Sequence, residues 1–465
     1  MENDYIPTIW SPGIRKADGP VYLAIADALS ADILSGRLVA GARLPPQRAL
    51  AEALKIDFTT VSRAYAEAGR RGLVEGRVGQ GTYVKSKRLD VNNSVPSGLV
   101  DMSMNLPPRF DNPGLVARMW DGIGKLESTG GIDLLMRYQE AGGAGRDRES
   151  GARWLSSRLE DVTPERVVIC PGAQGALVAV LGVLAAPGDT ICVEALTYPG
   201  FRSVASHLRI ELATVPIDDD GIIPEAFEKI CAESKPKALY CNPTLQNPTT
   251  ASLSLSRRHA LVEIARRYQV PIIEDDAYGA LPVDPIPPLA ALAPELVYHI
   301  AGLAKCIAPA LRIAYLVVPD GRAAARLNGA VRATASMASP LTAAIASRWI
   351  DDGTAEAVVA AIRQETAARQ LIATGILPQE FIRADPEGFH IWLTMTPAWT
   401  RGEFASRLRS AGIGVVASDA FALASPPEAV RLGLGAPETR DELSQSLRII
   451  ADLLNQSPAF SSLVV

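Results

Sequence analysis

The residues of this sequence that could do chemistry follow its apolar stretches. Asp275 and Tyr278 come after one such stretch, and Lys305 comes after another, with Arg312 seven residues further on. A lysine amine can form a Schiff base, a carboxylate can keep a ring nitrogen protonated, and a guanidinium can bind a phosphate. Taken singly, each residue also has a structural explanation, such as a solvated lysine, a helix cap or an ion-pair partner. The presence of all these residues together, in this order along the chain, is therefore what indicates a chemical role.

Three further segments are followed by residues that could take part in the same chemistry. Asn247 and Tyr198 each lie just beyond an apolar run, and residues 172–174 open a helix whose backbone N–H groups could hold a phosphate. Pyridoxal 5′-phosphate (PLP) needs an amine, a carboxylate for its ring nitrogen, donors for its phenolic oxygen, an aromatic ring over one face and an anion site. We therefore expect PLP as the cofactor.

The elements that must position these residues are short strands between helices. Continuous apolar, β-branched runs that alternate with helical segments predict an α/β fold, with a buried, mostly parallel sheet and helices on both faces. Ligands of such folds bind at the carboxyl ends of the strands, which is where the residues above lie. The expected strands are 167–169, 190–193, 238–240, 271–273 and 297–300.

The first part of the chain has a different pattern. Amphipathic helices are predicted over 20–35, from Pro46 onward and from Thr59 to Gly72, and residues 73–84 predict a β-hairpin. Two short helices joined by a tight turn match a helix-turn-helix, whose second helix lies in the major groove of DNA. On the pattern alone, a three-helix cap that merely packs is the alternative.

Residues 18–86 resemble the winged-helix domain of the GntR regulators, in the stretch GRLVAGARLPPQRALAEALKIDFTTVSRAYAEAGRRGLVEGRVGQGTYV. The resemblance implies a double-stranded DNA operator as partner. One departure is Phe58, where many relatives carry Arg before the two threonines, so that a DNA contact is lost or becomes apolar. The resemblance places DNA contacts at Arg48, Thr59, Thr60, Ser62 and, in the wing, Gly79, and charge and placement add Arg63 and Arg77.

Residues 101–455 resemble the fold-type I aminotransferases. This implies a fold-type I PLP-dependent transferase domain over 101–465, with a smaller C-terminal α+β subdomain, joined to the winged helix-turn-helix by a linker at 87–100. The resemblance makes Lys305 the Schiff-base lysine. It assigns Asp275 to the pyridine nitrogen, Tyr278 and Asn247 to the phenolic oxygen, Tyr198 to the ring face, Arg312 with Gly172, Ala173 and Gln174 to the phosphate, Arg431 to an effector carboxylate, and Tyr138 to the phosphate of a neighbouring subunit.

The surroundings of the lysine depart from this pattern. Many relatives have Ser or Thr three residues before the lysine and Ser directly before it, where this chain has Gly302 and Ala304. Two hydrogen bonds to the phosphate, of about 1–3 kcal/mol each, are then missing, so we expect weaker PLP retention or other donors. Cys306 could be redox-active, but a small buried apolar residue is the favoured interpretation.

The composition fits two folded domains rather than a fibre or a disordered chain, since 48% of the 465 residues are hydrophobic and 21% are charged. Residues 1–88 contain 13 Lys and Arg against 9 Asp and Glu, whereas the remainder contains 33 against 42. A basic front part suits nucleic acid. Scattered cysteines and histidines predict neither disulfides nor a metal site, and the acidic start and short apolar runs predict a soluble, cytoplasmic protein without a signal peptide.

The order of the two parts resembles the MocR subfamily of GntR regulators. This implies a transcriptional regulator, typically a head-to-tail homodimer, whose large domain senses PLP or an amino compound through Schiff-base chemistry. The alternative is an active PLP-dependent aminotransferase that transfers an amino group to a 2-oxo acid. Because a DNA-reading domain has little purpose on a purely metabolic enzyme, we favour regulation. A regulator that has abandoned PLP is disfavoured by the retained Lys305, Asp275, Tyr278 and Arg312.

Overall fold

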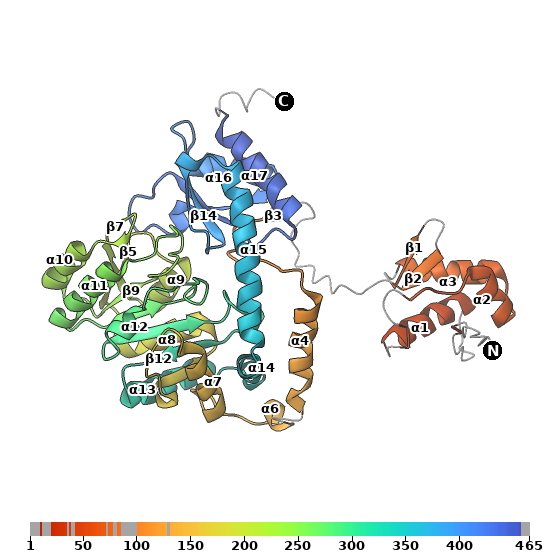
Figure 1. Ribbon diagram of the computed structural model, residues 1–465, viewed down its shortest axis with the longest axis horizontal. Coiled ribbons are helices and arrows are strands. Elements are labelled where there is room, and N and C mark those ends of the chain that lie inside the picture. The colour runs from red at the N-terminus through yellow and green to blue at the C-terminus, as the bar shows by residue number, and fades with distance from the viewer. Residues whose placement is uncertain are drawn as a thin grey trace. The chain divides into compact units, whose positions relative to one another are not determined.

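The computed structural model divides the chain into two compact units, Met1–Pro96 and Ser97–Val465 (Figure 1). It describes residues 10–11, 20–34, 37–38, 42–70, 73–77, 81–84, 100–127 and 131–456. Most of the expected linker lies outside these residues, and its last residue, Val100, begins strand β3 (Val100–Asp101). Each unit has a hydrophobic core of its own.

The small unit combines helices with a hairpin, as expected. Helices α1 (Val21–Leu34), α2 (Gln47–Leu54) and α3 (Phe58–Arg70) pack on one another through buried apolar side chains. Strands β1 (Val74–Arg77) and β2 (Gly81–Val84) pair antiparallel and form the predicted wing. The core contains Leu29, Leu50, Val61, Tyr65 and Ala68.

The turn between α2 and α3 is one residue shorter than the sequence predicted. Lys55 ends α2 in the left-handed conformation, with φ at 52°, and Phe58 is already the first residue of α3. Asp57 causes the early start, because its carboxylate accepts the backbone N–H of Thr59 at 2.8 Å and so satisfies a donor of the first turn. Phe58 thus belongs to the helix that is expected to read DNA.

The large unit is organised around a seven-stranded sheet. The five predicted strands are present and run parallel to one another. A further strand, β12, lies antiparallel between two of them, and β6 extends one edge. The spatial order is β4 (Val167–Cys170), β12 (Ala314–Val317), β11 (Val297–Gly302), β10 (Ile272–Asp275), β9 (Ala238–Cys241), β5 (Thr190–Glu194) and β6 (Glu211–Val215).

Helices cover both faces of this sheet, as the apolar strands require. Successive residues of a strand point to opposite faces, so that Val167 and Ile169 belong to one core and Val168 and Cys170 to the other. One core includes α7 (Gly145–Leu155), α10 (Pro224–Ser234), α11 (Leu255–Tyr268), α12 (Leu289–Leu292) and α14 (Pro340–Asp351), and the other includes α8 (Gly172–Leu184), α9 (Pro199–His207) and α13 (Gly321–Ala335).

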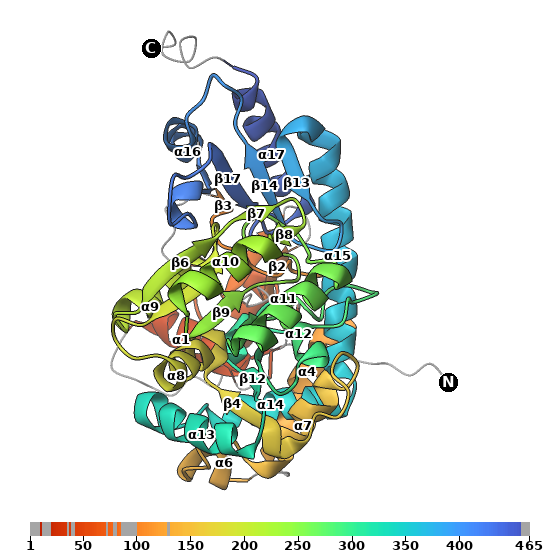
Figure 2. The same ribbon diagram turned by 90° about the vertical axis from the view of Figure 1, so that its left-hand side faces the viewer.

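The expected C-terminal subdomain is an antiparallel sheet with two helices. The long helix α15 (Thr354–Ile376) runs from α14 to this subdomain, as Figures 1 and 2 show. Strand β3 joins the subdomain from the start of the large unit, because it pairs with β15. The elements are β13 (Ile382–Ala384), β14 (His390–Thr394), β15 (Ile413–Gly414), β16 (Val416–Ala417), β17 (Ala429–Gly433), α16 (Arg401–Ser410) and α17 (Arg440–Leu454).

Among the described residues of the large unit, two α-helices and one pair of short antiparallel strands remain. These last elements are α4 (Pro113–Gly124), α6 (Asp133–Met136), β7 (Ile217–Asp218) and β8 (Gly221–Ile222). Among the described residues, no helix is long and apolar enough to cross a membrane.

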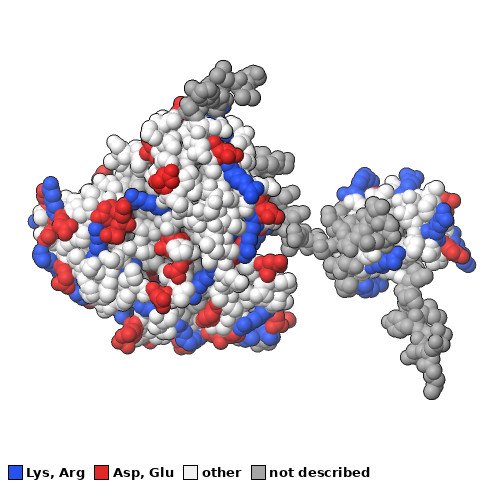
Figure 3. Space-filling model, turned by 45° about the horizontal axis from the view of Figure 1, so that its top comes forward, with Lys and Arg blue, Asp and Glu red and all other residues white. Residues whose placement is uncertain are grey.

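Acidic and basic side chains alternate on the visible face of the large unit, without a large area of one sign (Figure 3).

Candidate functional site

Lys305 lies just beyond the carboxyl end of β11, in a largely buried position. Its amine has a pKa lowered to about 8, mainly by burial and then by the positive charge of Arg431, whereas Asp275 opposes this effect. The ammonium donates to the backbone carbonyl of Asn105. A lysine with such a pKa is partly neutral near physiological pH, which is the state that attacks a carbonyl carbon.

Asp275 ends the neighbouring strand β10 and has one oxygen without a partner. Its Oδ2 accepts the Tyr240 hydroxyl at 2.9 Å, whereas its Oδ1 is buried and forms no hydrogen bond. Burial raises the pKa of this carboxyl to about 6, although the Tyr240 hydroxyl lowers it. A buried acceptor is normally paired, so this oxygen fits a protonated ring nitrogen such as that of PLP.

Arg431 on β17 and Asn247, both predicted site residues, lie together. The Nη1 of Arg431 donates to Oδ1 of Asn247 at 2.8 Å, and its Nη2 donates to the carbonyl of Ser103. The Nε of Arg431 is buried without a partner, and burial lowers the pKa of the guanidinium. Its charge is thus poorly compensated, as expected of a group that receives an anion.

The predicted phosphate site is formed by the N-terminus of α8 and Arg312. Gly172 has φ at +76°, which favours glycine, and a Cβ atom there would lie 3.2 Å from Nη2 of Arg312, so the guanidinium packs closely on this turn. Ala173 and Gln174 follow in the first turn, whose N–H groups point out of the helix. A guanidinium against a helix N-terminus makes an anion site.

Tyr198 and Tyr278 flank the same region. Tyr198 is half-buried before α9, and a Cβ atom at Gly200 would overlap its ring, so glycine is needed there. Its pKa is raised, mainly by burial and then by Asp275. Tyr278 is buried, and its hydroxyl accepts from the amide of Asn105 at 2.7 Å. The amine, the unpartnered carboxylate and the anion site therefore fit PLP.

Gly302, one of the two departures near the lysine, has room for a Cβ atom. A Cβ atom at Gly302 would lie 3.5 Å from the Cβ of Ala173, an ordinary contact distance. A serine side chain would thus fit, and the sequence departure is not forced by packing. Cys306 is buried, and burial raises its pKa to about 12, which agrees with the interpretation as a small apolar residue.

Several site residues were not assigned a role from the sequence. Tyr240 ends an apolar strand and resembles a core residue, yet it holds Asp275. Asn242 links two predicted residues, because it donates to the carbonyl of Asp275 and accepts the N–H of Asn247 at 2.9 Å. Asn242 follows a strand, and this position was its available signal, whereas Tyr240 lies within the strand. Asn105 lies in an irregular segment and carried no signal.

Two more buried titratable groups border the site. Glu194 accepts from the backbone N–H of Asn242 and from Nε2 of Gln246, each at 3.3 Å, and burial raises its pKa to about 8. His390 contacts the carbonyl of Gln246 through Nε2 at 3.0 Å, and burial lowers its pKa to about 3. The histidine is therefore neutral at physiological pH.

The residues expected to contact DNA surround the start of α3 in the small unit. Arg48 and Thr59 are exposed, and Thr60 and Ser62 are half-buried. The guanidinium of Arg48 lies 5.9 Å from the ring centre of Phe58. A cation–π contact of this kind holds the guanidinium near the position where relatives carry Arg.

The other expected DNA contacts differ in how far they are constrained. The exposed Arg63 lies over the ring of Tyr22, at 4.4 Å from its centre, and the Thr59 hydroxyl bonds to Asp57. Arg77 belongs to strand β1, and Gly79 lies outside the described residues. The structure therefore brings the helix residues together and leaves the wing residues as predictions.

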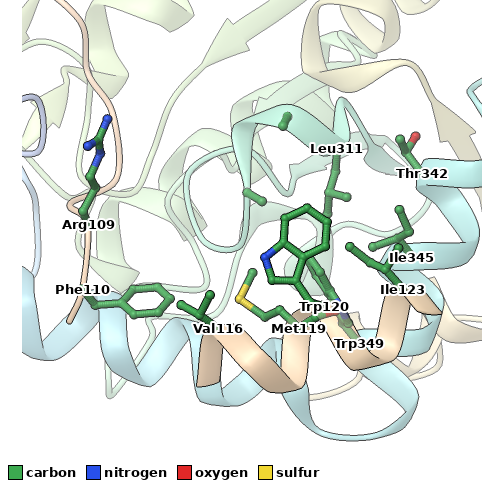
Figure 4. Close-up of a pocket in the computed structure, with 12 residues that line it drawn as sticks. Arg109, Phe110, Val116, Met119, Trp120, Ile123, Leu311, Thr342, Ile345 and Trp349 are labelled. Carbon is green, nitrogen blue, oxygen red and sulfur yellow. Dashed lines mark hydrogen bonds between the residues drawn. The ribbon is translucent and has the colours of Figure 1, made fainter. Parts of the chain in front are cut away.

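Tyr138 is not part of the cluster around Lys305 and is 88% exposed. Other apolar side chains near it, such as Ile132 and Met136, are also exposed. A cavity of about 550 Å³ opens between α4 and α14, where Trp120 and Met119 face Ile345 and Trp349 (Figure 4). The large unit thus presents an apolar surface, which is unusual for an isolated soluble domain.

Two family models match this chain. Residues 21–84 match "Bacterial regulatory proteins, gntR family", and residues 104–450 match "Aminotransferase class I and II". Among solved structures, LysN, an α-aminoadipate aminotransferase from Thermus thermophilus complexed with N-(5′-phosphopyridoxyl)-L-leucine, superposes with a TM-score of 0.70 at 24% identity over 79% of this chain and 94% of that one. This likeness shows the fold.

Several transcriptional regulators match this chain over 66–97% of its length. The uncharacterized HTH-type transcriptional regulator YdeF of Bacillus subtilis is 31% identical over 97% of each chain. The vitamin B6 salvage pathway transcriptional repressor PtsJ of Salmonella typhimurium is 27% identical over 90% of this chain and 95% of its own. The probable rhizopine catabolism regulatory protein MocR of Rhizobium meliloti is 28% identical over 66% of each. The chain therefore belongs to the GntR-type regulators that carry an aminotransferase class I and II domain, the MocR subfamily.

Proposed function

We propose that this protein is a DNA-binding transcriptional regulator whose large unit senses PLP, or an amino compound that reacts with PLP, at Lys305. The observation that carries the proposal is the partly neutral Lys305 amine beside a buried carboxylate with a free oxygen, in a chain that also has a GntR winged helix. The winged helix, 18–86, and the domain 101–465 act as separate parts, joined by the linker 87–100.

PLP, when bound, supplies an aldehyde for amines and a ring that withdraws electrons. Lys305 would hold the aldehyde carbon, Asp275 would keep a proton on the ring nitrogen, and Tyr278 and Asn247 would donate to the phenolic oxygen. Tyr198 would cover one face of the ring. Arg312 and the turn of Gly172, Ala173 and Gln174 would bind the phosphate, as their geometry supports.

Arg431 would determine the class of effector. Its guanidinium has a buried, unpartnered Nε and contacts Asn247, so an anionic group that reaches it restores the missing hydrogen bond. A carboxylate suits the planar guanidinium, because the two can form paired hydrogen bonds. An effector with an amine for Lys305 and a carboxylate for Arg431 satisfies both ends of the site.

The small unit would bind a double-stranded operator with α3 in the major groove. Arg48, Thr59, Thr60, Ser62 and Arg63 lie on or next to this helix, and the wing would bring Arg77 and Gly79 to the minor groove. Arginines that neutralise phosphates make the affinity depend on salt. DNA and effector thus use different units of one chain.

A homodimer would cover the apolar surface of the large unit. Trp120 is 64% exposed at the cavity between α4 and α14, and Ile132 and Met136 are exposed beyond it. Tyr138, with 88% of its surface exposed, is free to reach the phosphate site of a second copy. We propose the head-to-tail arrangement implied by the subfamily, and a cytoplasmic location.

Catalytic amino transfer is the second candidate function. The complete set of Lys305, Asp275, Tyr278 and Arg431 favours it, because these groups also suffice to exchange an amino group between PLP and a 2-oxo acid. Free 2-oxo acid released from an amino acid by the purified protein would support this candidate. Regulation is the better proposal, because an enzyme that only transfers amino groups has no use for a DNA-binding winged helix.

One experiment tests the proposed function directly. The purified full chain is titrated with PLP and then with a panel of amino acids, while absorbance reports the cofactor and fluorescence anisotropy reports binding to DNA from upstream of its own gene. We expect a visible absorbance band with PLP and a change in DNA affinity with a subset of amino acids. No visible band, or a DNA affinity that no amino compound or PLP alters, would overturn the proposal.

A further inference from the structure

Asn105 contacts the site without belonging to any of the motifs around it. It lies in the irregular segment after β3 and is 6% exposed. Its backbone carbonyl accepts from the Lys305 ammonium, and its side-chain amide donates to the Tyr278 hydroxyl at 2.7 Å. One residue therefore touches both the reactive amine and the tyrosine beside it.

The segment that carries Asn105 is held firmly against β17. The N–H of Gly433 donates to the carbonyl of Met102 at 2.8 Å, and Arg431 donates to the carbonyl of Ser103. A Cβ atom at Gly433 would approach the carbonyl oxygen of Met104 to 2.5 Å, so the two backbones lie closer than any side chain allows. The backbone that leads to Asn105 is thus held in place by its packing against β17, which positions the Asn105 amide.

The direction of the amide–hydroxyl bond decides where the hydroxyl proton goes. An amide nitrogen only donates, so the Tyr278 oxygen accepts from Asn105 and keeps its own proton free. Burial raises the pKa of Tyr278, Asp275 raises it further and Arg431 opposes this, so the hydroxyl stays protonated at physiological pH. The tyrosine is therefore a donor with an unused proton.

We infer that Asn105 is a positioning residue of the Lys305 site: by donating to the Tyr278 oxygen, it directs the Tyr278 proton to the ligand. The inference rests on the proposed function, because it assigns Tyr278 the role of donor to the phenolic oxygen of PLP. A hydrogen bond from Tyr278 stabilises negative charge on that oxygen. It therefore favours the deprotonated form of the PLP linkage to Lys305, and lowers the pH at which that linkage loses its proton.

The charged groups around Tyr278 do not perform this task. Arg431 on β17 and Asp275 on β10 act on it through their charge, and Tyr198 before α9 acts in the same way. Lys305 is bound to the carbonyl of Asn105. Only Asn105 is hydrogen-bonded to the Tyr278 hydroxyl among the described residues.

The test is the pH midpoint of the absorbance change of the PLP-loaded full chain. N105D keeps the side-chain shape but presents a carboxylate that accepts the Tyr278 proton, so we expect the midpoint to rise by about one unit, a tenfold change in proton affinity. N105L removes the polar group and leaves the hydroxyl unoriented, so we expect a smaller rise. Because N105D is isosteric, it decides the matter even if N105L folds poorly.

Two further variants separate positioning from charge and from general damage. N112D makes the same change at the residue that caps α4, where aspartate also caps well, and should leave the midpoint unchanged. In a Y278F background, N105D should shift the midpoint by less than a third of its effect in the wild type.

Each outcome has a defined meaning. If N105D and N105L both keep the wild-type midpoint, or if N105D shifts it equally with and without the Tyr278 hydroxyl, the positioning role is wrong. If the wild type forms no visible band with PLP, the proposed function itself fails, which is a distinguishable result. A rise that depends on Tyr278 supports the inference.

Discussion

The two functional regions of this molecule differ in how their residues depend on one another. Around Lys305, side chains from separate elements are buried and linked, as Arg431 is to Asn247 and Tyr240 to Asp275. At the start of α3, the side chains expected to contact DNA are exposed or half-buried, and Arg48 and Arg63 each contact a different aromatic ring. A buried network acts as a unit, whereas exposed contacts contribute separately. The effects of two substitutions should therefore be strongly non-additive around Lys305 in the large unit, and additive at the start of α3 in the small unit.

The largest expected effect comes from K305A. Removing the amine removes the point of covalent attachment, so borohydride reduction in the presence of PLP should give no adduct by mass spectrometry. DNA affinity without effector should stay within twofold of the wild type, because the lysine lies in the other unit. Loss of DNA binding in the same variant would mean that the regions are not separable.

The next effect is a pH dependence of PLP attachment. Because burial lowers the pKa of Lys305 to about 8, the reactive neutral amine becomes tenfold rarer with each pH unit below that value. The attachment rate should thus rise by roughly 50-fold between pH 6 and pH 8 and at most double above it, as stopped-flow absorbance would show. A constant rate over this range would contradict the buried environment of the amine.

R431K should weaken the response to amino acids by one to two orders of magnitude, roughly 1.4–3 kcal/mol. Lysine keeps the charge but cannot form the paired bonds to a carboxylate or hold Asn247 as a guanidinium does. The amino acid concentration that half-changes the PLP spectrum measures this loss. R440K, the same substitution in an exposed ion pair with Glu365, is the matched control and should leave the response intact.

R48A should reduce operator affinity about tenfold. It should also lower, by about one, the magnitude of the slope of log affinity against log salt concentration. Anisotropy titrations at several salt concentrations measure both quantities, and the PLP spectrum should not change. R63A should add to this loss independently in the double variant, since the two arginines contact different rings. Strong coupling between them would break the contrast drawn between the two regions.

The smallest expected effect is a gain from G302S. A Cβ atom at Gly302 would be in ordinary contact with Ala173, so a side chain can begin there without displacing its neighbour. We expect the serine hydroxyl to donate to the phosphate. We expect PLP to bind two- to tenfold more tightly, about 0.5–1.5 kcal/mol, by equilibrium titration. G302A fills the same space without a hydroxyl and should give no gain.

The fold was predictable from the sequence where a local pattern determines the element. The five apolar runs became parallel strands, and the three amphipathic segments became the helices of the small unit. Strand β12 was missed, because antiparallel insertion between β4 and β11 depends on pairing that no periodicity reports. Helix α3 starts one residue earlier than predicted, because the Asp57 carboxylate caps its first turn.

Most of the candidate site could also be predicted, because its residues follow strands or belong to motifs. Lys305, Asp275, Tyr278, Asn247 and Arg431 lie together in the structure. Tyr240 was hidden within an apolar strand, and Asn105 lies 200 residues before the lysine it contacts. Such contacts arise from the tertiary fold and leave no local trace.

The parallel pairing of β3 with β15 has a mechanical consequence. The chain that leaves the small unit enters the regular structure of the large unit at Val100, whose N–H bonds to Gly412 at 2.7 Å. This entry point belongs to the C-terminal subdomain, the same body that carries Arg431. Because Val100 and Arg431 belong to the same subdomain, we expect any movement of that subdomain on ligand binding to displace Val100 and Arg431 together.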